Sequence, residues 1–268
     1  MRKNVRRVLA AVLLAVLAVS GGYIAWKSLD YQKGGEDYAE AVEVAGLELP
    51  EELPPARTQD APQTGEEDGD LAAERDPWAA ALAQVDLDAL RQVNGDVVGW
   101  IAIPGTVLSY PVVQTGDNSY YLNRTWKRES SSVGAIFLEH TAEADLSGFH
   151  TLIYGHRMRN GTMFGSLRDY RSADYWREHP SVYVTMGGQV LIYDIFAAYE
   201  VGIREIVYRL DIEETGRQEE LIRYGLDHSA IDTGVVPTAE DRILTLSTCT
   251  GSGHATRWVV QAVLRAAE

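Results

Sequence analysis

An alternating segment of the chain reads Ile243-Leu244-Thr245-Leu246-Ser247-Thr248-Cys249 and stops at Thr250-Gly251-Ser252-Gly253. A period of two is typical of a strand with one buried face, and the glycines that follow indicate a loop. Cys249 therefore stands where a buried strand meets a loop. A thiol there can be held rigidly while it faces a cleft, as a nucleophile must be, or it can be a small apolar residue capping a core strand.

Seven further segments combine apolar and β-branched residues and are separated by turn signals. They cover residues 97–103, 107–113, 133–138, 151–154, 182–185, 190–201 and 256–264. Gly187 and Gly188 lie between two of them, as in a hairpin turn. With residues 242–249 they predict eight strands. Many short strands with few helices are typical of a mainly β fold, a barrel or a sandwich, rather than a parallel α/β sheet.

Helical patterns precede and interrupt these strands. Apolar residues recur at helical spacing over 78–93, and Asn94-Gly95 follows, which predicts a helix of about four turns. Two further helices are expected as insertions, at about 171–178 and 213–227. The second insertion comes directly before the strand that carries Cys249.

The N-terminus has the pattern of a membrane anchor. Residues 1–7 carry four basic side chains, and an apolar run follows over residues 8–26. Nineteen residues are close to the roughly 20 that cross a bilayer. The basic cluster predicts a single-pass protein of the cell membrane with a cytoplasmic N-terminus and an extracytoplasmic remainder. A cleavable signal peptide, cut near Ala18-Val19-Ser20, is the alternative.

Most of the negative charge lies just after this segment. Between Tyr31 and Asp76 there are fourteen acidic and three basic residues, which leave −11 of the total −15. Few large apolar residues and several prolines predict that residues 27–76 form an acidic, solvated spacer before a folded domain over 77–268. An acidic ligand-binding tail is the alternative. The remaining residues offer no basic patch, so nucleic-acid binding is not expected.

Cys249 is the single cysteine of a chain predicted to be exported, so its thiol is either inert or kept for its reactivity. A thiol nucleophile needs a proton acceptor, and His156 ends the apolar strand that begins at Thr151. His254, five residues after Cys249, is the competing candidate. His140, His179 and His228 are expected on the surface.

Arg257 is the candidate for stabilising an oxyanion. It opens the last predicted strand, and a loop of seven residues would bring it back beside Cys249. A guanidinium supplies fixed donors that do not deprotonate. A solvent-facing arginine on an edge strand is the alternative. Ligand spacings for zinc or calcium are missing from the sequence, so neither a metal nor a cofactor is predicted.

These features together resemble the class B sortases of Gram-positive bacteria, over roughly residues 94–264. Four blocks carry the resemblance: Asn94-Gly95-Asp96-Val97-Val98-Gly99-Trp100-Ile101; Tyr110-Pro111-Val112-Val113-Gln114 with Asp117-Asn118-Ser119-Tyr120-Tyr121-Leu122; Ile153-Tyr154-Gly155-His156 with Met163-Phe164-Gly165-Ser166-Leu167; and Thr245-Leu246-Ser247-Thr248-Cys249. The resemblance implies a closed eight-stranded β-barrel with an N-terminal helix and a helix inserted before the cysteine strand.

It also implies roles for individual residues. Cys249 would attack a Thr carbonyl in the C-terminal sorting signal of a secreted protein and form a thioacyl enzyme, with His156 as acid and base and Arg257 at the oxyanion. An amine of a peptidoglycan precursor, or a pilin lysine, would then resolve the intermediate. Asn118, Leu122 and Ser247 match positions of the substrate groove.

Two departures from the family pattern bear on this interpretation. Thr250 and Gly251 stand where acidic residues often follow the cysteine, which puts a carboxylate-assisted triad in doubt. Asp76-Pro77-Trp78 is similar to the lid tripeptide of pilin-polymerising sortases and is interpreted here as the start of a helix. A pilin polymerase, a hydrolytic thiol peptidase and a non-catalytic surface-binding barrel remain the alternative functions.

Overall fold

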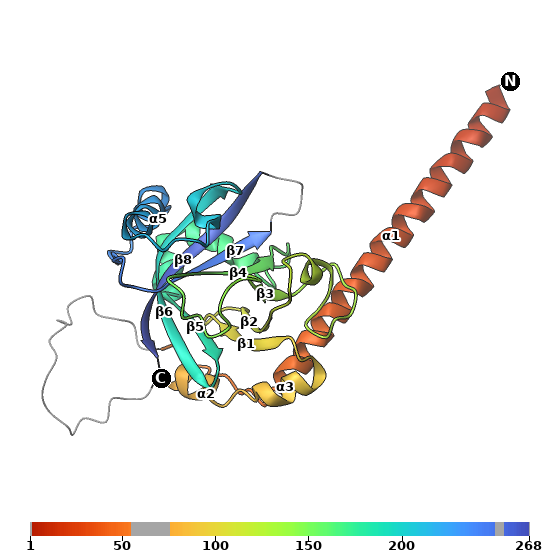
Figure 1. Ribbon diagram of the computed structural model, residues 1–268. Coiled ribbons are helices and arrows are strands. Elements are labelled where there is room, and N and C mark those ends of the chain that lie inside the picture. Colours follow the sequence, from red (N-terminus) through yellow and green to blue (C-terminus); the bar gives the residue numbers. More distant parts are fainter. Residues whose placement is uncertain (1, 55–75, 250–254, 268) are drawn as a thin grey trace, which may run out of the picture.

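The computed structural model of the chain describes residues 2–54, 76–249 and 255–267. Within them, eight strands close into a barrel in the order β1-β2-β3-β4-β7-β8-β6-β5 (Figure 1). All eight predicted strands are present: β1 Val97–Ala102, β2 Ser109–Val113, β3 Ile136–Leu138, β4 His150–His156, β5 Ser181–Met186, β6 Gln189–Gly202, β7 Ile243–Cys249 and β8 Thr256–Ala267. The mainly β prediction, a closed barrel, is therefore confirmed.

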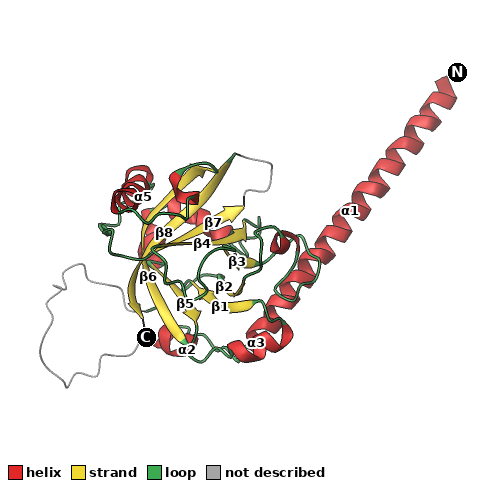
Figure 2. Ribbon diagram, viewed as in Figure 1, coloured by secondary structure: helices red, strands yellow, loops and turns green. Residues whose placement is uncertain are grey.

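The barrel is a mixed sheet. β2 pairs with β3, and β4 with β7, in parallel, while the other neighbours are antiparallel. The hairpin between β5 and β6 turns at Gly187 and Gly188, whose φ angles are +57° and +87°, a conformation that glycine adopts without strain. β6 is the longest strand, and its start pairs with β5 while most of its length also pairs with β8. It therefore closes the barrel (Figure 2).

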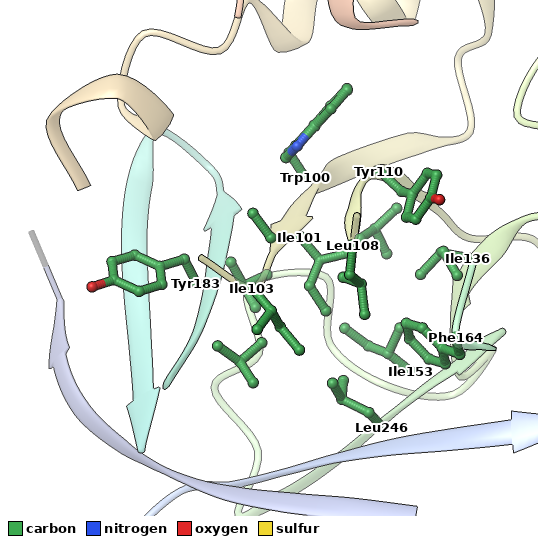
Figure 3. Packing of buried hydrophobic residues seen from close by; sticks show 14 of the residues in the cluster. Trp100, Ile101, Ile103, Leu108, Tyr110, Ile136, Ile153, Phe164, Tyr183 and Leu246 are labelled. Carbon is green, nitrogen blue, oxygen red and sulfur yellow. The ribbon is translucent and has the colours of Figure 1, made fainter. Parts of the chain in front are cut away.

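Apolar side chains of alternate residues fill the barrel. Ile101, Ile153 and Leu246 come from β1, β4 and β7, are fully buried and point toward one another (Figure 3). Burying a side chain of this size stabilises a fold by about 1.5–3 kcal/mol, so the interior is the main source of stability. The alternation that predicts the strands is thus the alternation between this interior and the outer face.

A second apolar cluster covers part of the outer face. Helix α5, Thr215–His228, and the 3-10 turn η3, Ile206–Tyr208, pack Leu221 and Val207 over β6 and β8. Both belong to the connection between β6 and β7, so the inserted helix predicted before the cysteine strand is confirmed. The other predicted insertion is η2, Gly165–Arg171, followed by α4, Ala173–Glu178. A shorter 3-10 turn, η1, spans Tyr120–Asn123.

The single four-turn helix predicted before the barrel is wrong. Two short helices stand there, α2, Pro77–Leu82, and α3, Leu87–Val93. The first helix ends at Leu82, and Asp86 begins the second as its N-cap, because its side chain accepts from the amide of Ala89 at 2.8 Å. The amide of Asp86 itself donates to Ala45 O. The interpretation of Asp76-Pro77 as a helix start is confirmed, since Asp76 is the N-cap and Pro77 the first helical residue.

The N-terminal helix α1, Arg2–Val44, continues without a break from the apolar segment to the barrel (Figure 1). It is the one helix of the described residues that is long and apolar enough to cross a membrane. A solvated spacer is expected over 27–76, but up to residue 54 the chain packs on the barrel instead. Tyr38, Ala41, Ala45 and Leu47 are buried in the main core, and the first three stand at helical spacing between acidic residues. Residues 55–75 lie outside the described residues.

A close contact of α5 provides a test of how this helix is seated. A Cβ added at Gly225 would stand 2.2 Å from Gln261 Oε1, and Gln261 is already bonded to Tyr199 and Thr245. We expect Gly225→Ala to lower the free energy of unfolding by about 1–3 kcal/mol through overpacking. Gly216→Ala in the same helix meets nothing within 4 Å and serves as the control. Urea unfolding of the full chain in detergent measures both, and equal values for the two variants would contradict this seating.

Candidate active site

The ends of β4 and β7 bring two candidate residues together. The two strands pair in parallel with His156 directly level with Cys249. Residues in register on neighbouring strands lie on the same face of a sheet. Ile153 and Leu246, also in register, face the barrel interior, so His156, three positions after Ile153, lies on the outer face. The structure thus places the backbone of Cys249 level with that of His156.

β8 approaches β7 from its other side. The antiparallel register of the two strands runs as far as Ser247 opposite Val259; Cys249 lies two residues after Ser247, and Arg257 two residues before Val259. The Arg257 side chain is half-buried, and its Nη1 donates to Thr256 O at 3.0 Å. β4, β7 and β8 are neighbours in the barrel, so His156, Cys249 and Arg257 lie on three adjacent strands, and we call these three residues the row. His254, the competing histidine, lies outside the described residues.

The His156 ring is held by backbone groups. Its Nε2 lies 2.6 Å from the carbonyl oxygen of Leu122 in η1. A carbonyl can only accept, so Nε2 carries a hydrogen in both protonation states and Nδ1 is the nitrogen that gains and loses the proton. Gly134 lies against the same ring, since a Cβ there would stand 2.6 Å from His156 Cδ2. With φ at +65°, position 134 requires glycine for its backbone as well as for space.

The three predicted groove residues differ in their surroundings. Ser247 is buried, and its Oγ shares a hydrogen bond of 2.9 Å with the hydroxyl of Tyr208. Leu122 is partly buried against the core and supplies the carbonyl that binds His156. Asn118 instead bridges Glu139, to which its Nδ2 donates at 2.7 Å, and the amide of His140. Ser247 and Leu122 therefore lie near the row, whereas Asn118 fastens the segments that flank β3.

Glu139 is a buried carboxylate in this flanking network. Burial opposes its ionisation, but hydrogen bonds from Thr141, Asn118 and His140 outweigh that effect and lower the pKa of Glu139 below its ordinary value. The group is therefore ionised and fully used as an acceptor by its neighbours. Glu139 thus holds the start of the β3–β4 connection in place through these hydrogen bonds.

The remaining histidines have varied surroundings. His140 and His228 are exposed, as expected, but His179 is buried, with its Nδ1 2.8 Å from Pro104 O. The surface position predicted for His179 is wrong because the chain after α4 folds back over the β1–β2 turn. His150, at the start of β4, is also buried, and its Nε2 lies 2.8 Å from Thr245 Oγ1. Burial lowers the pKa of His150 to about 4, so it is neutral at physiological pH.

A cavity of about 580 Å³ lies between the β3–β4 and β6–β7 connections. His150 and Thr151 contribute to it from β4, and Tyr208, Arg209 and Asp211 from the other connection. Tyr208 also contacts Ser247, so the cavity adjoins β7, which carries Cys249. Among the described residues, His, Cys, Asp and Glu do not gather in a group of three or more that could hold a metal ion.

Sequence reasoning missed two residues that shape this site. Gly134 supports the imidazole of His156 from a position that precedes β3, and the glycine before a strand was the available signal. Tyr208 reaches Ser247 from the long β6–β7 connection, and its sequence neighbourhood contains no pattern that points to β7.

Comparison with known proteins agrees with this geometry. The family model of the sortase domain matches residues 101–265, more than half of the chain and all but the start of the barrel. The chain therefore belongs to the sortase family of cysteine transpeptidases.

Within that family the similarity is to sortase B. Sortase B of Listeria monocytogenes is 34% identical over 164 residues, which are 61% of this chain and 67% of the relative. Sortase B of Staphylococcus aureus is 33% identical over 162 residues, or 60% of this chain and 66% of that protein.

Solved structures show the same likeness. The S. aureus sortase B–substrate complex superposes with a TM-score of 0.65 at 32% identity, over 69% of this chain and 85% of that one. Sortase B of Bacillus anthracis gives a TM-score of 0.67 at 27% identity, over 88% of this chain and 98% of that one.

The neutral His150 leads to a prediction about stability. Its folded pKa of about 4 lies below the ordinary 6.5, so the unfolded chain binds more protons between these values and stability falls as the pH is lowered through that window. We expect His150→Gln to remove about 3 kcal/mol of this acid-induced loss, measured by urea unfolding of the full chain at pH 7 and pH 4. The exposed His228→Gln is the control. An unchanged pH dependence in His150→Gln would contradict the assignment.

Proposed function

We propose that the chain is a membrane-tethered sortase that cleaves a C-terminal sorting signal after Thr and transfers the protein to a cell-wall amine. The observation that carries the proposal is the row of His156, Cys249 and Arg257 across β4, β7 and β8. A nucleophile, a base and a fixed cation are the groups that acyl transfer requires.

In the first half of the reaction, the thiolate of Cys249 attacks the Thr carbonyl and forms a carbon–sulfur bond. The carbon–nitrogen bond to the following residue then breaks, and the protonated His156 gives its Nδ1 proton to the leaving amine. The neighbouring Leu122 carbonyl supports this role, because it keeps the hydrogen of Nε2 in place and leaves Nδ1 to exchange protons.

In the second half, an amine of a peptidoglycan precursor attacks the thioester. His156 Nδ1 takes the amine's proton, the carbon–sulfur bond breaks, and the Cys249 thiolate is restored. Arg257 donates to the oxyanion in both halves, since a guanidinium keeps its charge and its planar donors throughout. Asn118, Leu122 and Ser247 are proposed to line the groove for the sorting signal, and a pilin lysine is the alternative acceptor.

The membrane assignment is part of the proposal. Helix α1 carries the apolar segment of residues 8–26 and the basic residues before it, which favours a cytoplasmic N-terminus and an extracytoplasmic barrel. Secreted proteins that bear sorting signals would reach the site on that side.

The nucleophile is tested by Cys249→Ala in the full-length chain. We expect it to abolish cleavage and transfer of a peptide that contains a sorting signal, because no thioester can form, while the unfolding midpoint stays within error of wild type. Mass spectrometry of wild-type products with and without an added glycine peptide separates transfer from hydrolysis. Turnover by Cys249→Ala would contradict the mechanism, and hydrolysis alone would make the chain a thiol peptidase.

Arg257→Lys probes the oxyanion. We expect kcat to fall about 10²-fold, since a lysine does not reproduce the planar pair of donors. Arg265→Lys on the same strand is the control, because Arg265 pairs with Asp194 at 3.3 Å away from the row. The measurement is the steady-state kinetics of peptide cleavage, and equal kcat values for the two variants would contradict a role of Arg257 in the site.

A further inference from the structure

The segment between η1 and β3 lies between helix α1 and His156. We name its residues, 124–135, the docking loop. One side of the docking loop is fastened to α1, where Trp126 Nε1 donates to Asp37 O at 2.7 Å and the amide of Ser132 donates to Asp30 at 3.0 Å. Ion pairs join Lys33 to Glu129 at 2.5 Å and Lys127 to Glu40 at 2.8 Å. These contacts lie along nearly three turns of α1, from Asp30 to Glu40, beyond its apolar segment.

The contact is closest where α1 has a glycine and a tyrosine. Gly34 is buried, and a Cβ there would stand 2.7 Å from Val133 Cγ2, so the helix approaches the docking loop at backbone distance. One turn later the buried Tyr38 donates its hydroxyl hydrogen to Gly134 O at 2.7 Å. Its ring also packs edge-on against Tyr110, with centroids 5.2 Å apart.

The other side of the docking loop holds the imidazole. Gly134, whose carbonyl binds Tyr38, lies against the His156 ring, and η1 supplies the Leu122 carbonyl for Nε2. Backbone hydrogen bonds from Ser131 to Asn123 and from Ala135 to Tyr121 tie the docking loop to η1. A short chain of direct contacts therefore runs from the anchor helix to the catalytic ring.

We propose that helix α1 is a positioning element of the active site, in which Tyr38 and Gly34 hold the docking loop so that Gly134 and Leu122 orient His156. The inference rests on the proposed function, because it concerns the base of that reaction. Proton transfer requires the ring nitrogen at hydrogen-bond reach of its partner, so a small rotation of the imidazole costs rate without changing how substrate binds. The membrane anchor would thus contribute to turnover as well as to location.

Tyr38→Phe tests the hydroxyl while it keeps the ring. In the full-length chain in nanodiscs we expect kcat to fall about threefold to tenfold with KM unchanged, and the pH profile of kcat/KM to shift. Tyr170→Phe is the matched control, since Tyr170 is also buried and donates to a backbone carbonyl, that of His179, at the same 2.7 Å. Equal kcat, KM and pH profiles in the two variants would overturn the inference.

The helix contact is tested by a second pair of variants. Gly34→Ala places a methyl group against Val133, whereas Gly35→Ala, the next residue, meets nothing within 4 Å. Both raise helix propensity alike, so a difference between them reports the contact with the docking loop. We expect only Gly34→Ala to lower kcat, with the unfolding midpoint of the barrel little changed. Equal activity in both would count against the inference.

A double variant separates positioning from general weakening. If Tyr38 acts through His156, Tyr38→Phe will have no further effect on the alkylation rate of Cys249 once His156 is replaced by alanine. Measuring the alkylation rate of Cys249 as a function of pH requires no sorting signal. It therefore reports the reactivity of the thiol even if the peptide is not turned over. Inactive wild type would contradict the proposed function, whereas equal effects of Tyr38→Phe with and without His156 would contradict this inference alone.

Discussion

The parallel pairing of β4 with β7 is the constraint on which the site depends. It sets His156 level with Cys249, although 92 intervening residues separate them in the chain. Because side chains alternate across a strand, a slip of one residue would move every side chain of one strand to the opposite face. The packed interior prevents that slip, since it would also expose Leu246 or Ile153. The apolar core therefore fixes the register that sets His156 level with Cys249.

The elements on the two sides of the β4–β7 pair contribute different groups to the site. β8 closes β7 on one side and carries Arg257 into the row through an antiparallel register. On the other side, η1 and the docking loop supply backbone rather than side chains to His156, through Leu122 O and Gly134. Backbone groups cannot change rotamer, so they hold an imidazole with little conformational freedom. Support of this kind suits a group that must give and take a proton at one place.

The N-terminal region joins this support to the apolar segment of α1. Its composition is that of a spacer, because acidic residues are frequent and large apolar ones few, yet Tyr38 and Ala41 place a narrow apolar stripe on the barrel. Composition averages over all faces of a helix, and only the spacing of a few residues reveals the stripe. The single helix predicted over 78–93 is wrong for a related reason, since Asp86 is the N-cap of α3 and its amide donates to Ala45 O, which lies far away in the chain.

The sequence by itself determined the eight strands, the apolar N-terminal segment, the lone Cys249 and its place at a strand end, because local periodicity and composition encode these features. Local pattern left His156 and His254 as competing candidates for the base, and the ordered motifs of the family resemblance favoured His156. Only the tertiary structure decided which residues of β4 and β7 stand level, that Leu122 O binds Nε2 of His156, and that α1 reaches Gly134 through Tyr38. Registers and backbone contacts join segments far apart in the chain, and closure of the barrel selects them through packing that no single segment contains.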